Sequence, residues 1–385
     1  MLPDPATLHP SLVVAASPAL DDTAAKPLED GMALSVSGGG YRAMLFHLGS
    51  MWRLNEIGYL RQLKRISSVS GGSITAGALA LAWNRLQFDA TGAATNFGDV
   101  VRTIRKVGST TIDVTSVLKG IFLPGSISDQ VIARLDELVC HGATLQDLPD
   151  HPRFVFNATN VQSGALWRFS RPYMRDWRVG EVRAPKVKLA IAVTASAAFP
   201  PVLSPLRMTL DPSTFTPGSG KDLQRPPFTT EVFLTDGGVY DNLGLETVWK
   251  RYQTVLVSDA GGLMAPLDRP ASDWGRHSKR VLDLLDHQVR NLRKRQIVGS
   301  LKAKVRSGAY WGIRTNIADY QLPDPLPCPY DKTIKLAEVA TRLKGLDDEV
   351  QERLINWGYA VCDAAIRRHV APNVPAPKFP YSRGV

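Results

Sequence analysis

Ile66–Ala80 reads ISSVSGGSITAGALA, which predicts a strand, a tight turn and a helix in direct succession. A β-branched and serine-rich run leads into Ser70, and two glycines and a run of small residues follow it. A nucleophile elbow needs this arrangement, because its strained turn admits only small neighbours and the helix N-terminus favours developing negative charge. The usual pattern is Gly-x-Ser-x-Gly, and Ser68 occupies the first glycine position here. An ordinary glycine-rich turn fits the same pattern, so further motifs must decide.

A second glycine-rich turn lies upstream, in Met32–Ala43, MALSVSGGGYRA. An apolar strand runs into Gly38, Gly39 and Gly40, and apolar residues then recur at helical spacing. Glycines at such a turn let bare backbone N–H groups point at an anion, which beside an elbow would be the oxyanion of an acyl-transfer intermediate. Arg42 could steady this loop or a phosphate. A nucleotide-binding loop is the alternative, but neither the dinucleotide glycine spacing nor the Lys-Ser/Thr of a P-loop is present.

A candidate acid ends a third apolar strand, in Val232–Asn242, VFLTDGGVYDN. Asp236 lies at the carboxyl end of the strand, where open α/β sheets place their chemistry, and could accept a proton from the serine directly. Asp241 lies beyond the Gly-Gly turn and is expected to cap or brace it. Asp259 ends the strand predicted at 254–258 and is a second competitor, for which we expect a structural role.

These motifs together resemble the signatures of patatin-like phospholipases. The matching segments are Ser37–Arg42, Ser68–Gly72 and Asp236–Gly238, in that order, with Ala195–Pro201 resembling the small-residue and proline segment that the family carries between them. The resemblance covers roughly residues 30–265. It departs from the family at Ser68, and at Ser37 where many members have Asp.

The resemblance implies a serine–aspartate dyad without histidine, and hydrolysis of lipid acyl esters. Carried over by position, Ser70 is the nucleophile and Asp236 the base. The oxyanion donors would come from Gly38, Gly39 and Gly40, with supporting roles for Arg42, Gly71 and Gly237. No cofactor and no metal are expected.

The composition is ordinary for a globular protein, with 44% hydrophobic and 21% charged residues in 385. No apolar run approaches the roughly 20 residues of a spanning helix, and no secretory signal is evident. Three distant cysteines, Cys140, Cys328 and Cys362, suit free buried thiols in a reducing compartment. The net charge of +10 favours attraction to an anionic membrane or to nucleic acid, and no nucleic-acid motif is present. We therefore expect a cytoplasmic protein, peripheral at the inner membrane face.

The predicted fold is a three-layer α/β/α domain with a mainly parallel sheet, because helical stretches separate the strands. The predicted strands are 32–36, 66–69, 154–158, 232–235 and 254–258. Residues 1–29 are expected to form an extended arm, 30–370 a single hydrolase domain that is helical from about 266, and 371–385 a tail. Short helices are expected near 101–107 and 117–122, a helix over 128–138, and two helices over 336–369 broken near Gly345.

Two segments have open roles. The insertion at 86–150 could cover the active site, although simple packing is favoured. Residues 276–306 form a basic amphipathic helix pattern whose apolar face is Val281, Leu282, Leu285, Val289 and Leu292. Such a helix suits a membrane surface, with Arg293, Lys294 and Arg295 as candidate lipid contacts, but a packed helix with a solvated basic face is favoured.

A serine–acid–histidine triad is the mechanistic alternative, because His277, His287 and His369 follow Asp236 in sequence. None of them ends a recognisable strand, and His47 is expected to pack inside a helix. The functional rivals to a constitutive phospholipase are an effector switched on by a partner or signal, as in bacterial defence, and a catalytically silent binding protein on the same scaffold.

Overall fold

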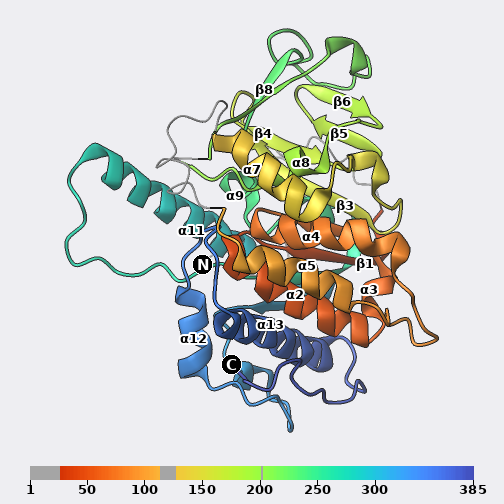
Figure 1. Ribbon diagram of the computed structural model, residues 1–385, viewed down its shortest axis with the longest axis vertical. Coiled ribbons are helices and arrows are strands. Elements are labelled where there is room, and N and C mark those ends of the chain that lie inside the picture. The colour runs from red at the N-terminus through yellow and green to blue at the C-terminus, as the bar shows by residue number, and fades with distance from the viewer. Residues whose placement is uncertain (1–26, 113–126, 201–202) are drawn as a thin grey trace, which may run out of the picture.

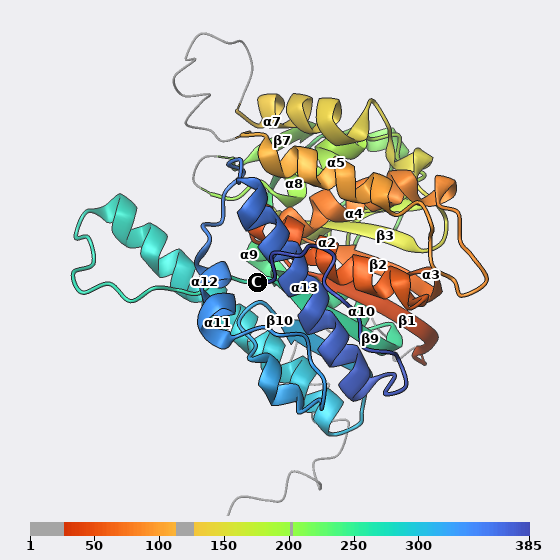
Figure 2. The same cartoon turned by 60° about the horizontal axis from the view of Figure 1, so that its bottom comes forward.

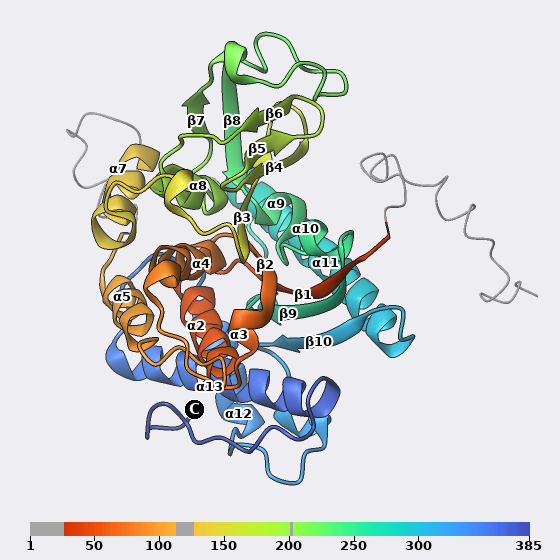
Figure 3. The ribbon, with the colours of Figure 1, turned by 90° about the vertical axis from the view of Figure 1, so that its right-hand side faces the viewer.

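The computed structural model describes residues 27–112, 127–200 and 203–385. Most of the expected N-terminal arm and the short helix expected at 117–122 lie outside these residues. Inside them, one ten-stranded sheet runs through the molecule (Figure 1). Its order is β10-β9-β1-β2-β3-β4-β5-β6, with β8 paired to β3 and β7 paired to β8 (Figure 3).

The first half of this order is parallel and the second half antiparallel. The parallel strands are β1 (Glu29–Val36), β2 (Leu63–Ser68), β3 (Arg153–Asn160), β9 (Tyr252–Asp259) and β10 (Ser307–Gly312). The antiparallel strands are β4 (Ala165–Phe169), β5 (Tyr173–Asp176), β6 (Gly180–Arg183), β7 (Leu206–Thr209) and β8 (Glu231–Asp236). All five predicted strands are present. The strand predicted at 232–235 runs antiparallel, because it returns as the second half of a pair with β7.

The strands that carry the serine and aspartate motifs meet along one edge of β3. β2 pairs in parallel with the start of β3, with Ser68 opposite Phe156. β8 pairs antiparallel with the end of β3, with Asp236 opposite Ala158. Because β4 occupies the other edge of β3 over the same residues, β2 and β8 share one edge and run toward each other. Their carboxyl ends therefore meet beside the middle of β3.

Helices cover both faces of the sheet, which gives the expected three layers (Figure 3). One layer holds α2 (Gly40–Glu56), α4 (Gly71–Ala82), α5 (Gly98–Ser109), α8 (Leu189–Ser196) and α13 (Asp348–His369). The other holds α9 (Gly238–Asp241), α10 (Glu246–Trp249) and α11 (Trp274–Lys302). Shorter helices connect them: α3 (Tyr59–Gln62), α7 (Ile127–Leu135) and α12 (Tyr330–Glu338).

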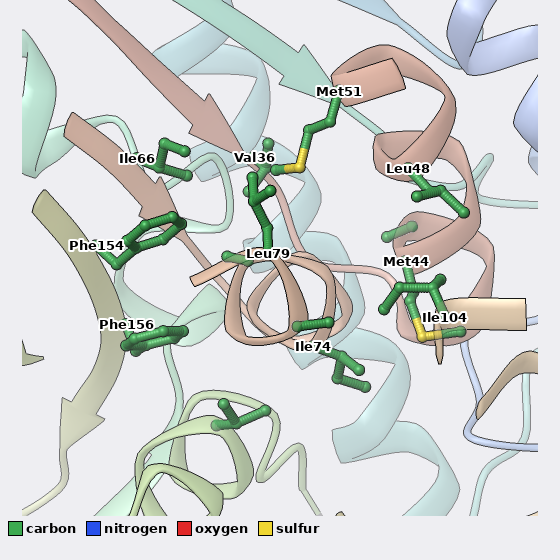
Figure 4. Close-up of a cluster of buried hydrophobic side chains, with 14 of the residues drawn as sticks. Val36, Met44, Leu48, Met51, Ile66, Ile74, Leu79, Ile104, Phe154 and Phe156 are labelled. Carbon is green, nitrogen blue, oxygen red and sulfur yellow. The ribbon is translucent and has the colours of Figure 1, made fainter. Parts of the chain in front are cut away.

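The helix α4, which begins directly after Ser70, is buried on all sides. Its side chains Ile74 and Leu79 lie between the sheet residues Val36 and Phe154 and the facing helix α2 (Figure 4). Small residues allow this central position, because a helix enclosed by other elements must be apolar all round. The elbow is thus fixed to the centre of the larger core.

Several smaller expectations are confirmed. The helix predicted at 128–138 begins at Ile127 and ends in a π-helical turn, Asp136–Cys140. The second helix predicted within 336–369 is α13, whereas the first was misplaced, because α12 begins upstream at Tyr330 and ends at Glu338. The three cysteines are free and buried.

The long basic helix α11 is present, but its first half is not packed as favoured. Val281, Leu282 and Leu285 are exposed, and the only buried residues of α11 are Arg290 and Ile297. Figures 1 and 2 show this half projecting away from the body of the molecule. The amphipathic pattern was recognised correctly, whereas the partner of its apolar face was not.

The crossing of α2 and α13 depends on two glycines. A Cβ on Gly358 would lie 1.8 Å from the carbonyl oxygen of Phe46, and one on Gly49 would lie 1.9 Å from that of Ile355. The facing backbone cannot make room for either Cβ unless the two helices move apart. These glycines therefore determine how closely α13 packs against α2.

Gly358→Ala should therefore lower the free energy of unfolding by about 1–3 kcal/mol, as overpacking of a tight contact does. Gly299→Ala is the matched control, since a Cβ at Gly299 on α11 meets nothing within 4 Å. Urea denaturation of both variants measures the difference. Equal stability of Gly358→Ala and wild type would contradict the close contact.

Candidate active site

Ser70 occupies the turn between β2 and α4 in a strained conformation, with φ 52° and ψ −123°. A non-glycine residue adopts positive φ at a cost of about 1–3 kcal/mol, which the surroundings must offset. They do so here through the backbone N–H of Ser70, which donates to the carbonyl oxygen of Ser196 at 3.2 Å and to its Oγ at 3.0 Å. The strain presents the Ser70 side chain at the N-terminus of α4, as an elbow requires.

Three further hydroxyls brace the elbow from behind. Ser73 Oγ donates to Ser68 Oγ at 2.9 Å and lies 2.9 Å from Ser196 Oγ. Ser68 Oγ in turn donates to the carbonyl oxygen of Val155 on β3 at 3.2 Å. The serine that replaces the usual glycine therefore ties the turn to the neighbouring strand. Ser196 lies in the segment Ala195–Pro201, whose sequence did not predict a part in this network.

Asp236 ends β8, is 2% exposed and hydrogen-bonds the side chain of Ser70. The N–H of Gly238 donates to its Oδ1 at 2.7 Å. Burial raises the pKa of Asp236 to about 7, and the hydrogen bonds from Gly238 and Ser70 offset that effect only in part. A carboxyl group with this pKa can take up and release a proton near neutral pH.

Polar side chains of β3 hold the two strand ends in place. Asn157 Nδ2 donates to Ser67 Oγ and to the carbonyl oxygen of Ser68, both at 2.9 Å. Thr159 Oγ1 donates to the carbonyl oxygen of Asp236 at 2.9 Å. Gly237 is needed at this junction, because a Cβ there would lie 2.2 Å from the carbonyl oxygen of Asn157.

The glycine loop lies against the elbow, but its three glycines differ in environment. The N–H of Gly38 already donates to the carbonyl oxygen and to Oδ1 of Asn242, each at 3.1 Å. Within the described part of the chain, no oxygen accepts a hydrogen bond from the N–H of Gly39 or Gly40. Gly38 and Gly39 line the pocket, whereas Gly40 packs behind them, where a Cβ on Gly71 would meet its carbonyl oxygen at 2.0 Å.

Asn242 lines the pocket, although no sequence motif pointed to it. Its only signal was its position directly after the Asp-Gly-Gly motif and Asp241. The structure shows why it matters: it joins the glycine loop to the segment that follows Asp236.

Arg42 is buried and fixes the far side of the loop. Its Nε donates to the carbonyl oxygen of Ala260 at 3.2 Å, and its Nη1 donates to that of Val339. Burial, reinforced by the nearby charge of Arg290, lowers the pKa of Arg42 to about 10. The side chain remains cationic at neutral pH and lines the pocket.

The competing acids have structural partners. Asp241 accepts hydrogen bonds from the N–H groups of Leu243 and Glu246, which makes it a brace of the turn, as expected. Asp259 accepts from the N–H of Gly261 and from the hydroxyl of Tyr310.

The histidines in the described part of the chain do not form a triad. His47 is fully buried; its Nε2 donates to the carbonyl oxygen of Ser37 at 2.9 Å and its Nδ1 accepts from Ser258 Oγ. Burial lowers the pKa of His47 to about 4, so the ring is neutral and supports the glycine loop. His287 lines the pocket, but its ring nitrogens contact Asn291 and Arg314. Among the described residues, no histidine hydrogen-bonds Ser70 or Asp236.

A pocket of about 570 Å³ opens over Ser70 and Asp236. One wall is formed by residues of α11, and another by the segment 337–342. Phe199 and Leu263 belong to its rim and are 39% and 45% exposed. Further exposed apolar side chains lie on the projecting half of α11 and on the segment that precedes it: Leu267, Trp274, Val281, Leu282, Leu284 and Leu285.

In the described part of the chain, no group of three or more His, Cys, Asp or Glu is arranged to hold a metal ion. No described helix has both the length and the apolar character needed to cross a bilayer.

Comparison with solved structures returns proteins of low sequence identity. Human GIVD cytosolic phospholipase A2 is 14% identical with a TM-score of 0.41, over 63% of this chain and 49% of that one. The same human protein in complex with methyl gamma-linolenyl fluorophosphonate is 12% identical with a TM-score of 0.48, over 87% of this chain and 57% of that one. VipD from Legionella pneumophila is 16% identical with a TM-score of 0.31, over 82% of this chain and 66% of that one. The chain thus spans between half and two thirds of the length of these proteins.

No curated protein matches the chain at a significant level. A family description does match: patatin-like phospholipase, over residues 34–249, which is more than half of the sequence and includes Ser70 and Asp236. The chain therefore belongs to the patatin-like phospholipase family, a family of serine hydrolases.

Proposed function

We propose that the protein is a lipid acyl hydrolase of the phospholipase A type, in which Ser70 is the nucleophile and Asp236 the general base. The observation that carries the proposal is the hydrogen bond between the Ser70 side chain and a buried carboxyl group whose pKa lies near 7, at the floor of an open pocket. A nucleophile and its base must be within hydrogen-bond reach, and the proximity of the Ser70 and Asp236 side chains supports these proposed roles.

In the proposed reaction Ser70 Oγ attacks the ester carbonyl carbon while its proton passes to Asp236. The alkoxide of the lyso product then leaves as Asp236 returns the proton to it, and an acyl-enzyme remains. Water attacks the acyl carbonyl with Asp236 again as base, which releases the fatty acid and regenerates Ser70.

The oxyanion that forms in each half-reaction lies nearest to the glycine loop. Gly39 lines the pocket with an N–H that no described oxygen accepts, so it is the leading donor. The N–H of Gly38 becomes available only if Asn242 releases it. The N-terminus of α4 adds its partial positive charge beside the same point.

The substrate of such an enzyme lies in a bilayer, and we propose that the exposed apolar side chains beside the pocket dock there. Trp274 is 86% exposed, and Leu282 and Leu285 are 55% and 57% exposed. The basic residues expected to contact lipid are less suitable, since Arg293 pairs with Glu246 at 3.0 Å and Lys294 lies over the Tyr310 ring. Shallow apolar insertion beside the mouth would bring an ester bond to Ser70.

Ser70→Ala should abolish hydrolysis of a phospholipid and of a soluble nitrophenyl ester, because no other described hydroxyl contacts Asp236 as this one does. Labelling with a fluorophosphonate reports the activated serine directly. The matched control is Ser213→Ala, whose hydroxyl bonds only to Asp211 in an exposed loop.

The labelling experiment also separates the rival functions. Reaction of the isolated protein, lost in Ser70→Ala, supports a constitutive enzyme. Reaction only after a cell extract is added supports a switched effector. No reaction under either condition would refute the assignment of Ser70 as the nucleophile.

The pH dependence follows from Asp236. Its raised pKa of about 7 means that the carboxyl is protonated below that pH and cannot accept the serine proton. We expect kcat/KM on a soluble ester to fall about tenfold for each pH unit below 7 and to level off above it. Asp236→Asn should remove the activity and, with it, the fall of kcat/KM below pH 7. A profile that stays flat down to pH 5 would show that Asp236 is not the base.

Docking can be measured by co-sedimentation with phosphatidylcholine vesicles. Leu282→Asp with Leu285→Asp should weaken vesicle binding by about tenfold or more, given that burying one leucine contributes about 1.5–3 kcal/mol. Hydrolysis of the soluble ester should stay unchanged. Val161→Asp, 58% exposed in the turn after β3, is the control. Unaltered vesicle binding by the double variant would place the docking surface elsewhere.

A further inference from the structure

A second and larger cavity, of about 820 Å³, lies apart from the catalytic pocket and shares no lining residue with it. Its walls come from β4 and β5 on one side and from α10 and its flanking residues on the other. The proposed lipid chemistry uses none of these side chains.

The lining of this cavity is strongly basic. Its cationic side chains are Arg65, Arg168, Arg175, Arg178, Lys221, Lys250 and Arg251, and its carboxylates are Glu29, Asp222 and Glu246. Each carboxylate already pairs with one of these cations: Asp222 with Arg178, Glu246 with Lys250 and Glu29 with Arg251. A fourth cation, Arg175, pairs with Glu181 outside the lining at 3.9 Å. Cations still outnumber the carboxylates around this concave space, and such a surplus of positive charge concentrates anions.

Arg65 is the most constrained of these cations. It lies on β2, is 2% exposed and donates through Nη1 to the carbonyl oxygen of Thr247 at 2.9 Å. Its Nε has no hydrogen-bond partner, and no carboxylate in the described part of the chain lies within 4.0 Å of it. A buried guanidinium with neither a counter-charge nor a full set of acceptors is costly, so an anion in the cavity would stabilise it.

Tyr173 reports the strength of the positive field. Burial alone would raise the pKa of this phenol, but the charges of Arg65 and Arg168 outweigh burial and hold its pKa below the usual value. The cavity therefore favours negative charge even on a phenol that is half-buried.

We infer that this cavity binds a small phosphate-bearing anion with at least two negative charges. Guanidinium groups suit phosphate oxygens because they donate in pairs, and the aromatic rings of Trp177 and Tyr240 in the lining offer a surface for an organic portion. One short helix connects the two sites: Tyr240 of α9 lines this cavity, and Gly238, the first residue of α9, donates to Asp236. The inference does not depend on the proposed function, because it concerns a separate cavity.

Calorimetric titration of the full chain with inorganic pyrophosphate tests the site, and glycerol 3-phosphate is a second probe that represents a lipid head group. Binding of either probe supports the site. Tighter binding of glycerol 3-phosphate indicates a lipid head group as the natural ligand, and tighter binding of pyrophosphate indicates a free phosphate compound. Removal of one charged hydrogen bond should weaken binding by about ten- to a hundredfold in Arg168→Gln and in Arg65→Gln. If Arg65→Gln does not fold, Lys250→Gln replaces it.

Two controls make the result specific. Arg207→Gln removes an exposed cation outside the cavity and should leave the affinity unchanged. Ser70→Ala should bind pyrophosphate as wild type does, which separates this cavity from the catalytic pocket. The inference is overturned if neither probe binds, or if Arg168→Gln and Arg207→Gln bind equally well.

Discussion

The site depends on one constraint: β2 and β8 pair with the same edge of β3, and their carboxyl ends meet there. β2 occupies the beginning of that edge and β8 the end, and they run in opposite directions until their carboxyl ends meet. Asn157 bridges the junction from β3 itself. The separation of Ser70 and Asp236 is therefore set by the hydrogen-bond register of a single strand, and no flexible loop has to bring them together.

The sequence was sufficient for what depends on local chemistry. Ser70 needs small neighbours and a helix behind it, and Asp236 needs an apolar strand before it and glycines after it, so both were recognisable as motifs. The strands were recognisable because each is a short apolar run bounded by turn residues. The catalytic roles remain predictions, although the structure does bring these two side chains into contact.

The features that could not be predicted from the sequence depend on contacts between residues that lie far apart in the chain. The direction of β8 follows from its pairing with β7 and β3, which no local pattern encodes. The bond between Gly38 and Asn242 joins residues 204 positions apart, and it changes which glycine is free to bind an oxyanion. Likewise, the cations of the second cavity come from segments whose spacing along the chain shows no motif.

The projecting half of α11 has a consequence for local stability. A helical segment of this length that buries no apolar face is marginal in water. It is held by the cap of Asp273, by side-chain pairs such as Lys279 with Asp283, and by the bond from Arg280 to the carbonyl oxygen of Ala265. Its amide hydrogens should therefore exchange with solvent faster than those around Ile297, where the helix meets the core. Contact with a surface would then order the segment, and the entropy lost in that step would keep the attachment weak enough to reverse.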